Sequence, residues 1–141
     1  MKKISSIAVY CGSSAGNNHL YFEEAENIGK FLAINKIKLI YGGGNLGLMG
    51  AVSGAALKNG GEVMGVITSH LVNKEKINDD LSDIHIVESM SERKNKMFNA
   101  ADAFLILPGG IGTLEEFFEI LSWKQLKLHS KDILIYNVNN Y

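Results

Sequence analysis

Six short apolar runs, rich in Ile, Val, Leu and Tyr, recur along the chain. Most of them are apolar at every position and do not alternate with polar residues. Strands that are covered on both faces, as in parallel sheets, have this pattern, whereas half-exposed strands alternate. The sequence therefore predicts buried strands at residues 4–10, 37–41, 62–67, 84–87, 103–107 and 133–138.

Between most of these runs the apolar residues recur at helical spacing. In residues 19–35, for example, Phe22, Ala25 and Leu32 fall on one stripe of a helix. An alternation of strands and helices indicates a three-layer α/β sandwich, with a mostly parallel sheet and right-handed crossovers. Residues 71–83 are polar and without pattern, so we expect a mobile loop there that could act as a lid. Further helices are predicted at residues 48–58, 91–101 and 113–128.

Composition narrows the classes of protein that fit this pattern. The chain has 141 residues, 46% hydrophobic and 21% charged, which suits one compact domain spanning residues 1–141. The net charge of −1 gives no reason to expect a nucleic acid or an anionic membrane as partner. Cys11 is the one cysteine, so no disulfide can form within the chain. Since we find neither an export signal nor an apolar stretch of membrane-spanning length, we expect a cytoplasmic protein.

Glycine and serine gather where three of the predicted strands end. The sequences at these places are CGSSAG at residues 11–16, GGGNLGLMG at 42–50 and PGGIGT at 108–113. In open parallel sheets, ligands bind outside the carboxyl ends of the strands. We therefore expect a ligand site that is built from these loops.

The second loop contains the spacing Gly42-x-Gly44-x-x-Gly47, which matches the glycine fingerprint of dinucleotide-binding folds. That fingerprint also needs an acidic residue at the end of the next strand, where it binds the ribose hydroxyls. Here the next strand ends in VITS at residues 66–69, without an acid. A dinucleotide is therefore disfavoured and a single phosphate favoured, with a plain tight turn as the alternative.

The third loop precedes another predicted helix and is followed by two carboxylates. Consecutive amides of a glycine turn, together with the positive end of a helix dipole, can bind an anion. Thr113 and Glu116 also fit a capping box, T-x-x-E, with Thr113 as N-cap and Glu116 at N3. The alternative is that Glu116 faces the crevice beside a sugar. Glu115 would then be a solvated neighbour or a hydroxyl ligand.

Arg93 and Lys94 begin the helix that follows the fourth strand. Arginine can hold a phosphate through planar, bidentate contacts; the alternative is an ordinary solvated surface. The four histidines are scattered without metal-ligand spacing. Nothing marks a Schiff-base lysine for pyridoxal phosphate, so we expect neither a metal nor another cofactor.

The stretches YGGGNLGLMG, ERKNKM and LPGGIGTLEE, in this order and at this spacing, resemble the LOG family of cytokinin-activating phosphoribohydrolases. The stretches VYCGSS and LSWKQLKLH are similar to that family too, so the resemblance covers nearly the whole chain. It implies a Rossmann-like sandwich that forms a homodimer or a larger even assembly. It also implies hydrolysis of the N-glycosidic bond of purine or cytokinin nucleoside 5′-monophosphates, such as AMP, to free base and ribose 5-phosphate.

The resemblance further implies roles for particular residues. The catalytic pair would be Arg93 and Glu116. Relatives typically continue for a few tens of residues past the position of Tyr141, so we expect a shortened carboxyl terminus. The alternative function is a nucleotide- or cofactor-binding carrier without turnover. The substrate- and phosphate-binding positions would be Ser13, Gly43, Gly44, Glu75, Lys94, Gly109, Gly110, Ile111, Gly112, Thr113, Leu114, Glu115 and Ser122.

Overall fold

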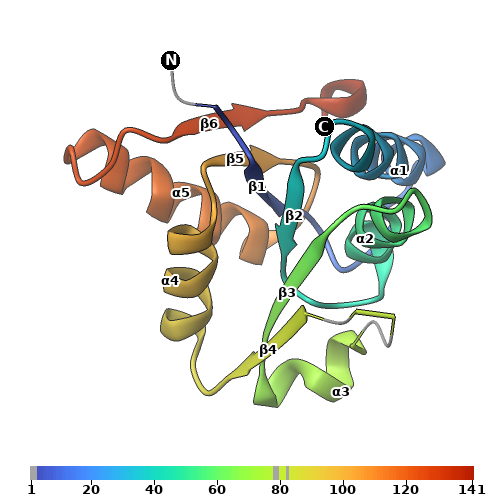
Figure 1. Ribbon diagram of the computed structural model, residues 1–141, viewed down its shortest axis with the longest axis horizontal. Helices are drawn as coiled ribbons and strands as arrows, with labels where there is room; N and C mark the ends of the chain where they lie inside the picture. The colour runs from blue at the N-terminus through green and yellow to red at the C-terminus, as the bar shows by residue number, and fades with distance from the viewer. Residues whose placement is uncertain (1–2, 78–79, 82) are drawn as a thin grey trace.

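The computed structural model describes residues 3–77, 80–81 and 83–141. Within these residues one sheet of six strands forms the centre of the molecule, and every pair of neighbouring strands is parallel (Figure 1). The strand order is β4-β3-β2-β1-β5-β6. The strands are β1 (Ser6–Tyr10), β2 (Lys38–Tyr41), β3 (Val63–Thr68), β4 (Asp83–Val87), β5 (Ala103–Ile106) and β6 (Asp132–Ile135).

Helices cover both faces of the sheet, which confirms the predicted three-layer α/β sandwich. Helices α1 and α2 pack together on one face of the sheet, and α4 and α5 lie on the other face (Figure 1). The helices are α1 (His19–Ile34), α2 (Gly47–Lys58), α3 (Val72–Glu75), α4 (Met90–Ala100) and α5 (Ile111–Gln125), with 3-10 turns η1 (Ser69–Leu71) and η2 (Val138–Asn140).

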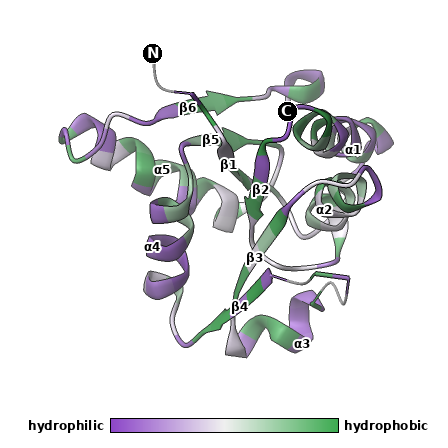
Figure 2. Cartoon of the chain, viewed as in Figure 1, coloured by the Kyte–Doolittle hydropathy of each residue, from purple (hydrophilic) through white to green (hydrophobic). Residues whose placement is uncertain are grey.

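The continuous apolar runs follow from this layering, because successive side chains of a strand point to opposite faces. In β1, Ala8 and Tyr10 join the hydrophobic cluster that includes Met97 of α4. Val9 joins the cluster on the other face, which includes Val52 of α2. Both faces of a central strand are therefore buried, and Figure 2 shows mostly hydrophobic residues along β5 beside the largely hydrophilic helix α4.

Two segments differ from the sequence prediction. The last strand is an edge strand that leaves Leu134 and Ile135 exposed, and it ends before the 3-10 turn η2. The stretch predicted as an unpatterned loop contains η1 and α3, and Ile77 forms an isolated antiparallel bridge with Gly44. The parts of that predicted loop at residues 78–79 and 82 lie outside the described residues.

The order of the strands places one crevice at the carboxyl edge of the sheet. The chain builds outward from β1 through β2 and β3 to β4, and it then returns to place β5 on the other side of β1. The loops after β1 and β5 therefore lie side by side, and the amide of Gly12 donates to the carbonyl of Pro108 at 3.0 Å. Such a reversal of strand order is where open α/β sheets bind ligands.

Candidate functional site

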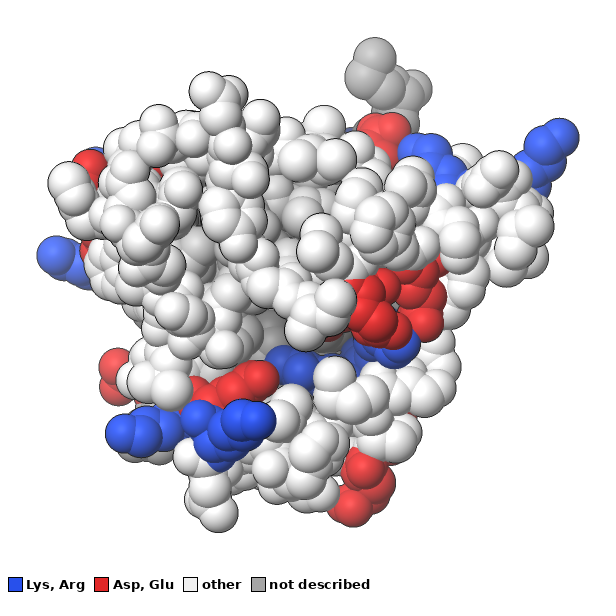
Figure 3. Space-filling view, turned by 180° about the vertical axis from the view of Figure 1, so that it is seen from behind, with Lys and Arg blue, Asp and Glu red and all other residues white. Residues whose placement is uncertain are grey.

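A cavity of about 600 Å³ lies at this edge, and it gathers residues from loops far apart in the sequence. Its walls combine apolar side chains with charged groups of both signs. Figure 3 shows basic side chains beside acidic ones around a hollow on the face turned away in Figure 1. The cavity is lined by Cys11, Gly12, Ser13, Met49, Leu71, Glu75, Met90, Arg93, Lys94, Gly110, Ile111, Gly112, Thr113, Glu115 and Glu116.

Arg93 is held in place by β3 and by the loop that follows β2. Its Nε donates to the carbonyl of Val66 at 2.9 Å, and its Nη2 donates to the carbonyl of Gly42 at 2.7 Å. The same Nη2 lies 3.5 Å from Oε2 of Glu75. Arg93 is only 5% exposed, so the alternative of an ordinary solvated arginine is wrong. Because two backbone carbonyls fix it, its charge has a defined position in the cavity.

The start of α4 explains how Arg93 reaches this position. Ser89 is the N-cap, and its hydroxyl accepts from the amide of Glu92 at 3.0 Å. The carboxylate of Glu92 reaches back to accept from the amide of Glu88 at 3.3 Å. The sequence alone contains this S-x-x-E pattern, which is typical of a helix start but was not identified from the sequence. It sets Arg93 in the first turn of α4, directed at the sheet.

The start of α5 differs from the prediction. The helix begins at Ile111 with Gly110 as N-cap, and no side chain of the described residues caps it. The predicted capping box is therefore wrong: Thr113 is the third helical residue and is buried. The first N–H groups of a helix lack intrahelical partners and attract anions. Since residues 110–113 all line the cavity, this helix end suits a phosphate.

Glu116 lines the same cavity with an altered acidity. Burial raises its pKa from 4.5 to about 7. The charge of Arg93 opposes this rise, while Glu115 and Glu75 add to it. A carboxyl group with a pKa near neutrality can exchange protons at working pH, and strongly perturbed groups in clefts are candidates for catalysis.

Lys94 joins α4 to α5 through two carboxylates. Its Nζ donates to Oε1 of Glu115 and to Oε2 of Glu119, the latter at 2.8 Å. These hydrogen bonds raise the pKa of Lys94 above its ordinary value. Lys94 therefore stays charged in the cavity, where its ammonium group is paired with the carboxylate of Glu115.

The two glycine loops, similar in sequence, differ in structure. The amides of Leu48 and Met49, near the start of α2, donate to the carbonyl of Gly12 at 3.1 and 3.3 Å. The amide of Asn45 donates to the carbonyl of Lys76 at 2.7 Å. In this loop, amides that could have met an anion are thus bonded to the protein itself.

The remaining predicted positions are divided between the cavity and its surroundings. Ser13 and Glu75 line the cavity, the latter without any sequence motif to announce it. Among the described residues, Gly43 and Gly44 are absent from its walls. Gly109 and Leu114 line a neighbouring apolar pocket. Ser122 donates to the carbonyl of Glu119 at 3.1 Å and is exposed outside the cavity.

Sequence reasoning missed the apolar wall formed by Met49, Leu71 and Met90. Their only signal was position, since each lies in a segment that follows a strand. Burial raises the pKa of the Cys11 thiol, with Glu116 adding to the effect, so this thiol stays neutral.

Among the described residues, no three His, Cys, Asp or Glu side chains gather to hold a metal. In the same residues, no helix combines the length and the apolarity that crossing a membrane requires.

Comparisons with known proteins find a family model and relatives that together cover most of the chain. A family model described as "Possible lysine decarboxylase" matches residues 49–141. The probable cytokinin riboside 5′-monophosphate phosphoribohydrolase LOGL9 of Oryza sativa subsp. japonica is 45% identical, over 96% of this chain and 60% of that protein. The cytokinin riboside 5′-monophosphate phosphoribohydrolase of Rhodococcoides fascians is 44% identical, over 96% and 69%. The chain thus spans about 60% of the first relative and 69% of the second.

Solved structures share the fold at lower identity. The molybdenum cofactor carrier protein of Chlamydomonas reinhardtii superposes with a TM-score of 0.76 at 22% identity, over 94% of this chain and 76% of that chain. The molybdenum cofactor binding protein of Rippkaea orientalis gives 0.73 at 22% identity, over 96% and 77%. At this identity the likeness shows the Rossmann-like fold alone.

Proposed function

Because this chain belongs to the LOG family of phosphoribohydrolases, we propose that it hydrolyses the N-glycosidic bond of purine nucleoside 5′-monophosphates, AMP or its cytokinin analogues, to free base and ribose 5-phosphate. One observation carries the proposal. A single cavity holds the uncapped start of α5, a fixed guanidinium at Arg93 and a carboxyl group at Glu116 whose pKa is about 7.

In this proposal the 5′-phosphate binds at the start of α5. The free amides there and the positive end of the helix dipole favour a dianion. Lys94 and Arg93 supply further positive charge along the same wall. Binding energy at the phosphate, remote from the bond that breaks, fixes the sugar in a reactive position. A nucleoside without phosphate should therefore be a much poorer substrate.

Glu116 then acts at the sugar. As the bond between C1′ and the base nitrogen breaks, positive charge builds on the sugar, as in other glycoside hydrolyses. Glu116 as carboxylate accepts a proton from water while the water oxygen bonds to C1′, and the departing base takes up a proton from solvent. A base with a pKa near 7 is well matched to this task, and the same negative charge stabilises the cationic sugar.

The description attached to the family model, lysine decarboxylase, has little support in the cavity. That chemistry uses a lysine that forms a Schiff base, which requires a neutral amine. Within the described lining, Lys94 is the one lysine, and Glu115 and Glu119 raise its pKa. A lysine held as a cation by two carboxylates is poorly suited to attack a carbonyl.

We further propose that the protein forms a homodimer or larger homo-oligomer in the cytoplasm. Support comes from α5, where Ile111, Leu114, Phe118 and Leu121 recur at helical spacing and are all exposed. Large apolar side chains on one stripe of a helix favour a protein contact. Light scattering with size-exclusion chromatography measures the mass, and a monomer at micromolar concentration would contradict this part.

The direct test is to incubate the protein with AMP, an N6-substituted AMP and adenosine, and to measure free base by chromatography. We expect release from both nucleotides and little from adenosine. Glu116→Gln should abolish release, whereas Glu26→Gln, an exposed carboxylate on α1 away from the cavity, should not. Equal turnover of AMP and adenosine would refute the scheme. Tight nucleotide binding without release would favour the carrier alternative.

A further inference from the structure

The glycine run after β2 has a function in packing that the sequence motif conceals. A β-carbon added to Gly42 would lie 2.3 Å from Nη2 of Arg93 and 3.1 Å from Sδ of Met49. Real β-carbons essentially never come closer than 3.0 Å to such neighbours. The space that any side chain at this position would need is therefore filled by two residues of the cavity wall.

Arg93 has little freedom to give way. Its guanidinium is buried and donates to the carbonyls of Gly42 and Val66. Buried charged groups need such partners, and losing one costs more than an ordinary hydrogen bond. A methyl group on Gly42 would push Nη2 away from the carbonyl of that same residue. Gly42 thus supplies both the acceptor and the room for the arginine.

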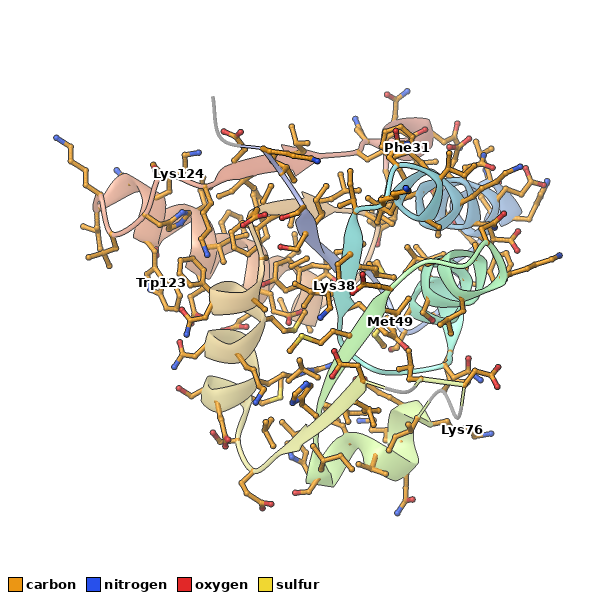
Figure 4. All side chains as sticks on the ribbon, viewed as in Figure 1. Phe31, Lys38, Met49, Lys76, Trp123 and Lys124 are labelled. Atoms are coloured by element: carbon orange, nitrogen blue, oxygen red, sulfur yellow. The ribbon has the colours of Figure 1, made fainter. Side chains whose placement is uncertain are left out.

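The next glycines support the same wall. A β-carbon on Gly44 would lie 2.9 Å from Cε of Met49 and 3.2 Å from the carbonyl oxygen of Glu75. Figure 4 labels Met49, which lies between α2 and the sheet. Gly43 has a φ of +80°, a conformation that glycine adopts readily and other residues rarely do. The missing side chains of Gly42 and Gly44 thus leave the space that Arg93, Met49 and Glu75 occupy.

We propose that Gly42 is a positioning residue for the hydrolysis: its carbonyl and its missing side chain place the guanidinium of Arg93 in the cavity. The glycine motif then serves the reaction through Arg93 and not by binding a phosphate. The effect on rate rests on the proposed function, whereas the contact between Gly42 and Arg93 can be tested without any turnover.

The kinetic test compares Gly42→Ala with Gly54→Ala. Gly54 lies in α2, and a β-carbon there meets nothing within 4 Å, so this variant controls for the added methyl group. We expect Gly42→Ala to lower kcat roughly 100-fold, the order expected for a misplacement of about 1 Å. The charge of Arg93 lowers the pKa of Glu116, so the inflection of the pH–rate profile should also move to higher pH. An unchanged kcat and profile would overturn the proposal.

A double-mutant cycle on melting temperature isolates the contact itself. Gly42→Ala should lower the melting temperature of the native protein much more than that of Arg93→Ala, because the shorter side chain removes the closer of the two contacts and leaves that with Met49. Arg93 lines the cavity, so water can enter its place and bond the freed carbonyls. Should Gly42→Ala fail to fold alone, Arg93→Ala should restore folding. An equal loss in both backgrounds would refute the role of Arg93.

The two tests fail separately. If the native protein releases no base from AMP, the proposed function fails, and the cycle of melting temperatures still decides whether Gly42 positions Arg93. If base is released but the cycle shows no coupling, the hydrolase stands and the positioning role is refuted.

Discussion

Replacing Glu116 with glutamine should stabilise the protein at pH 8, although it removes the proposed base. The pKa of Glu116 is about 7 in the folded protein, against 4.5 without the fold. Between these two values the folded state binds the proton more tightly, so stability falls as pH rises through this window and levels off above pH 7. At about 1.4 kcal/mol per pKa unit, the loss amounts to roughly 3 kcal/mol.

Glutamine has the shape of the protonated acid but cannot ionise. Glu116→Gln should therefore come nearest to the native protein at pH 5 and exceed it most at pH 8, by a free energy of unfolding up to roughly 3 kcal/mol. Denaturant unfolding at half-unit steps between pH 5 and pH 8, without ligand, measures the difference. Glu26→Gln on α1 is the control, since that carboxylate is exposed and lies outside the cavity. A pH-independent difference for Glu116→Gln would refute the buried-carboxylate reasoning.

Three further outcomes are expected. The rate of base release from AMP should rise tenfold per pH unit below pH 7 and level off above it, because Glu116 must ionise to accept a proton; a rate that falls over that range would make Glu116 an acid. Gly112→Ala should raise the free energy of unfolding by up to about 1 kcal/mol, because alanine favours the helix and its methyl group meets open space. The same methyl group lies at the proposed phosphate site and should raise KM for AMP, whereas Gly54→Ala should not change KM. Lys94→Met should raise KM for AMP roughly tenfold, in proportion to about 1.4 kcal/mol of lost interaction, and leave KM for adenosine unchanged.

The sheet was predictable because its physical cause is local. A strand such as β1 must be apolar at every position when α4 packs on one face and α2 on the other. The edge strand β6 lacks that double cover, and its predicted extent was too long at the carboxyl side. The short helix α3 was missed because four residues give no periodicity to read.

The site was predictable only in part, because its decisive contacts are tertiary. The loops before α2 and α5 read alike as glycine-rich turns. The amides of Leu48 and Met49 near the start of α2 donate to the carbonyl of Gly12, in the loop after β1, and no local sequence pattern indicates these hydrogen bonds. The start of α5 lacks such a partner among the described residues. T-x-x-E at Thr113 and S-x-x-E at Ser89 are likewise equal as patterns, yet Ser89 is the one that caps a helix.

The geometry of α5 is compatible with the proposed phosphate site and Glu116 lying on the same helix. A helix rises about 1.5 Å per residue, so Glu116 lies about 7.5 Å along the axis from Ile111, where the helix begins. That separation leaves room for a sugar between a phosphate on the amides and the carboxylate. The positive charges of Arg93 and Lys94 lower the pKa of Glu116, so they keep the carboxylate available despite its burial. In the proposed reaction, a single helix without a side-chain cap at its start would therefore both bind the phosphate and set its distance from the bond that breaks.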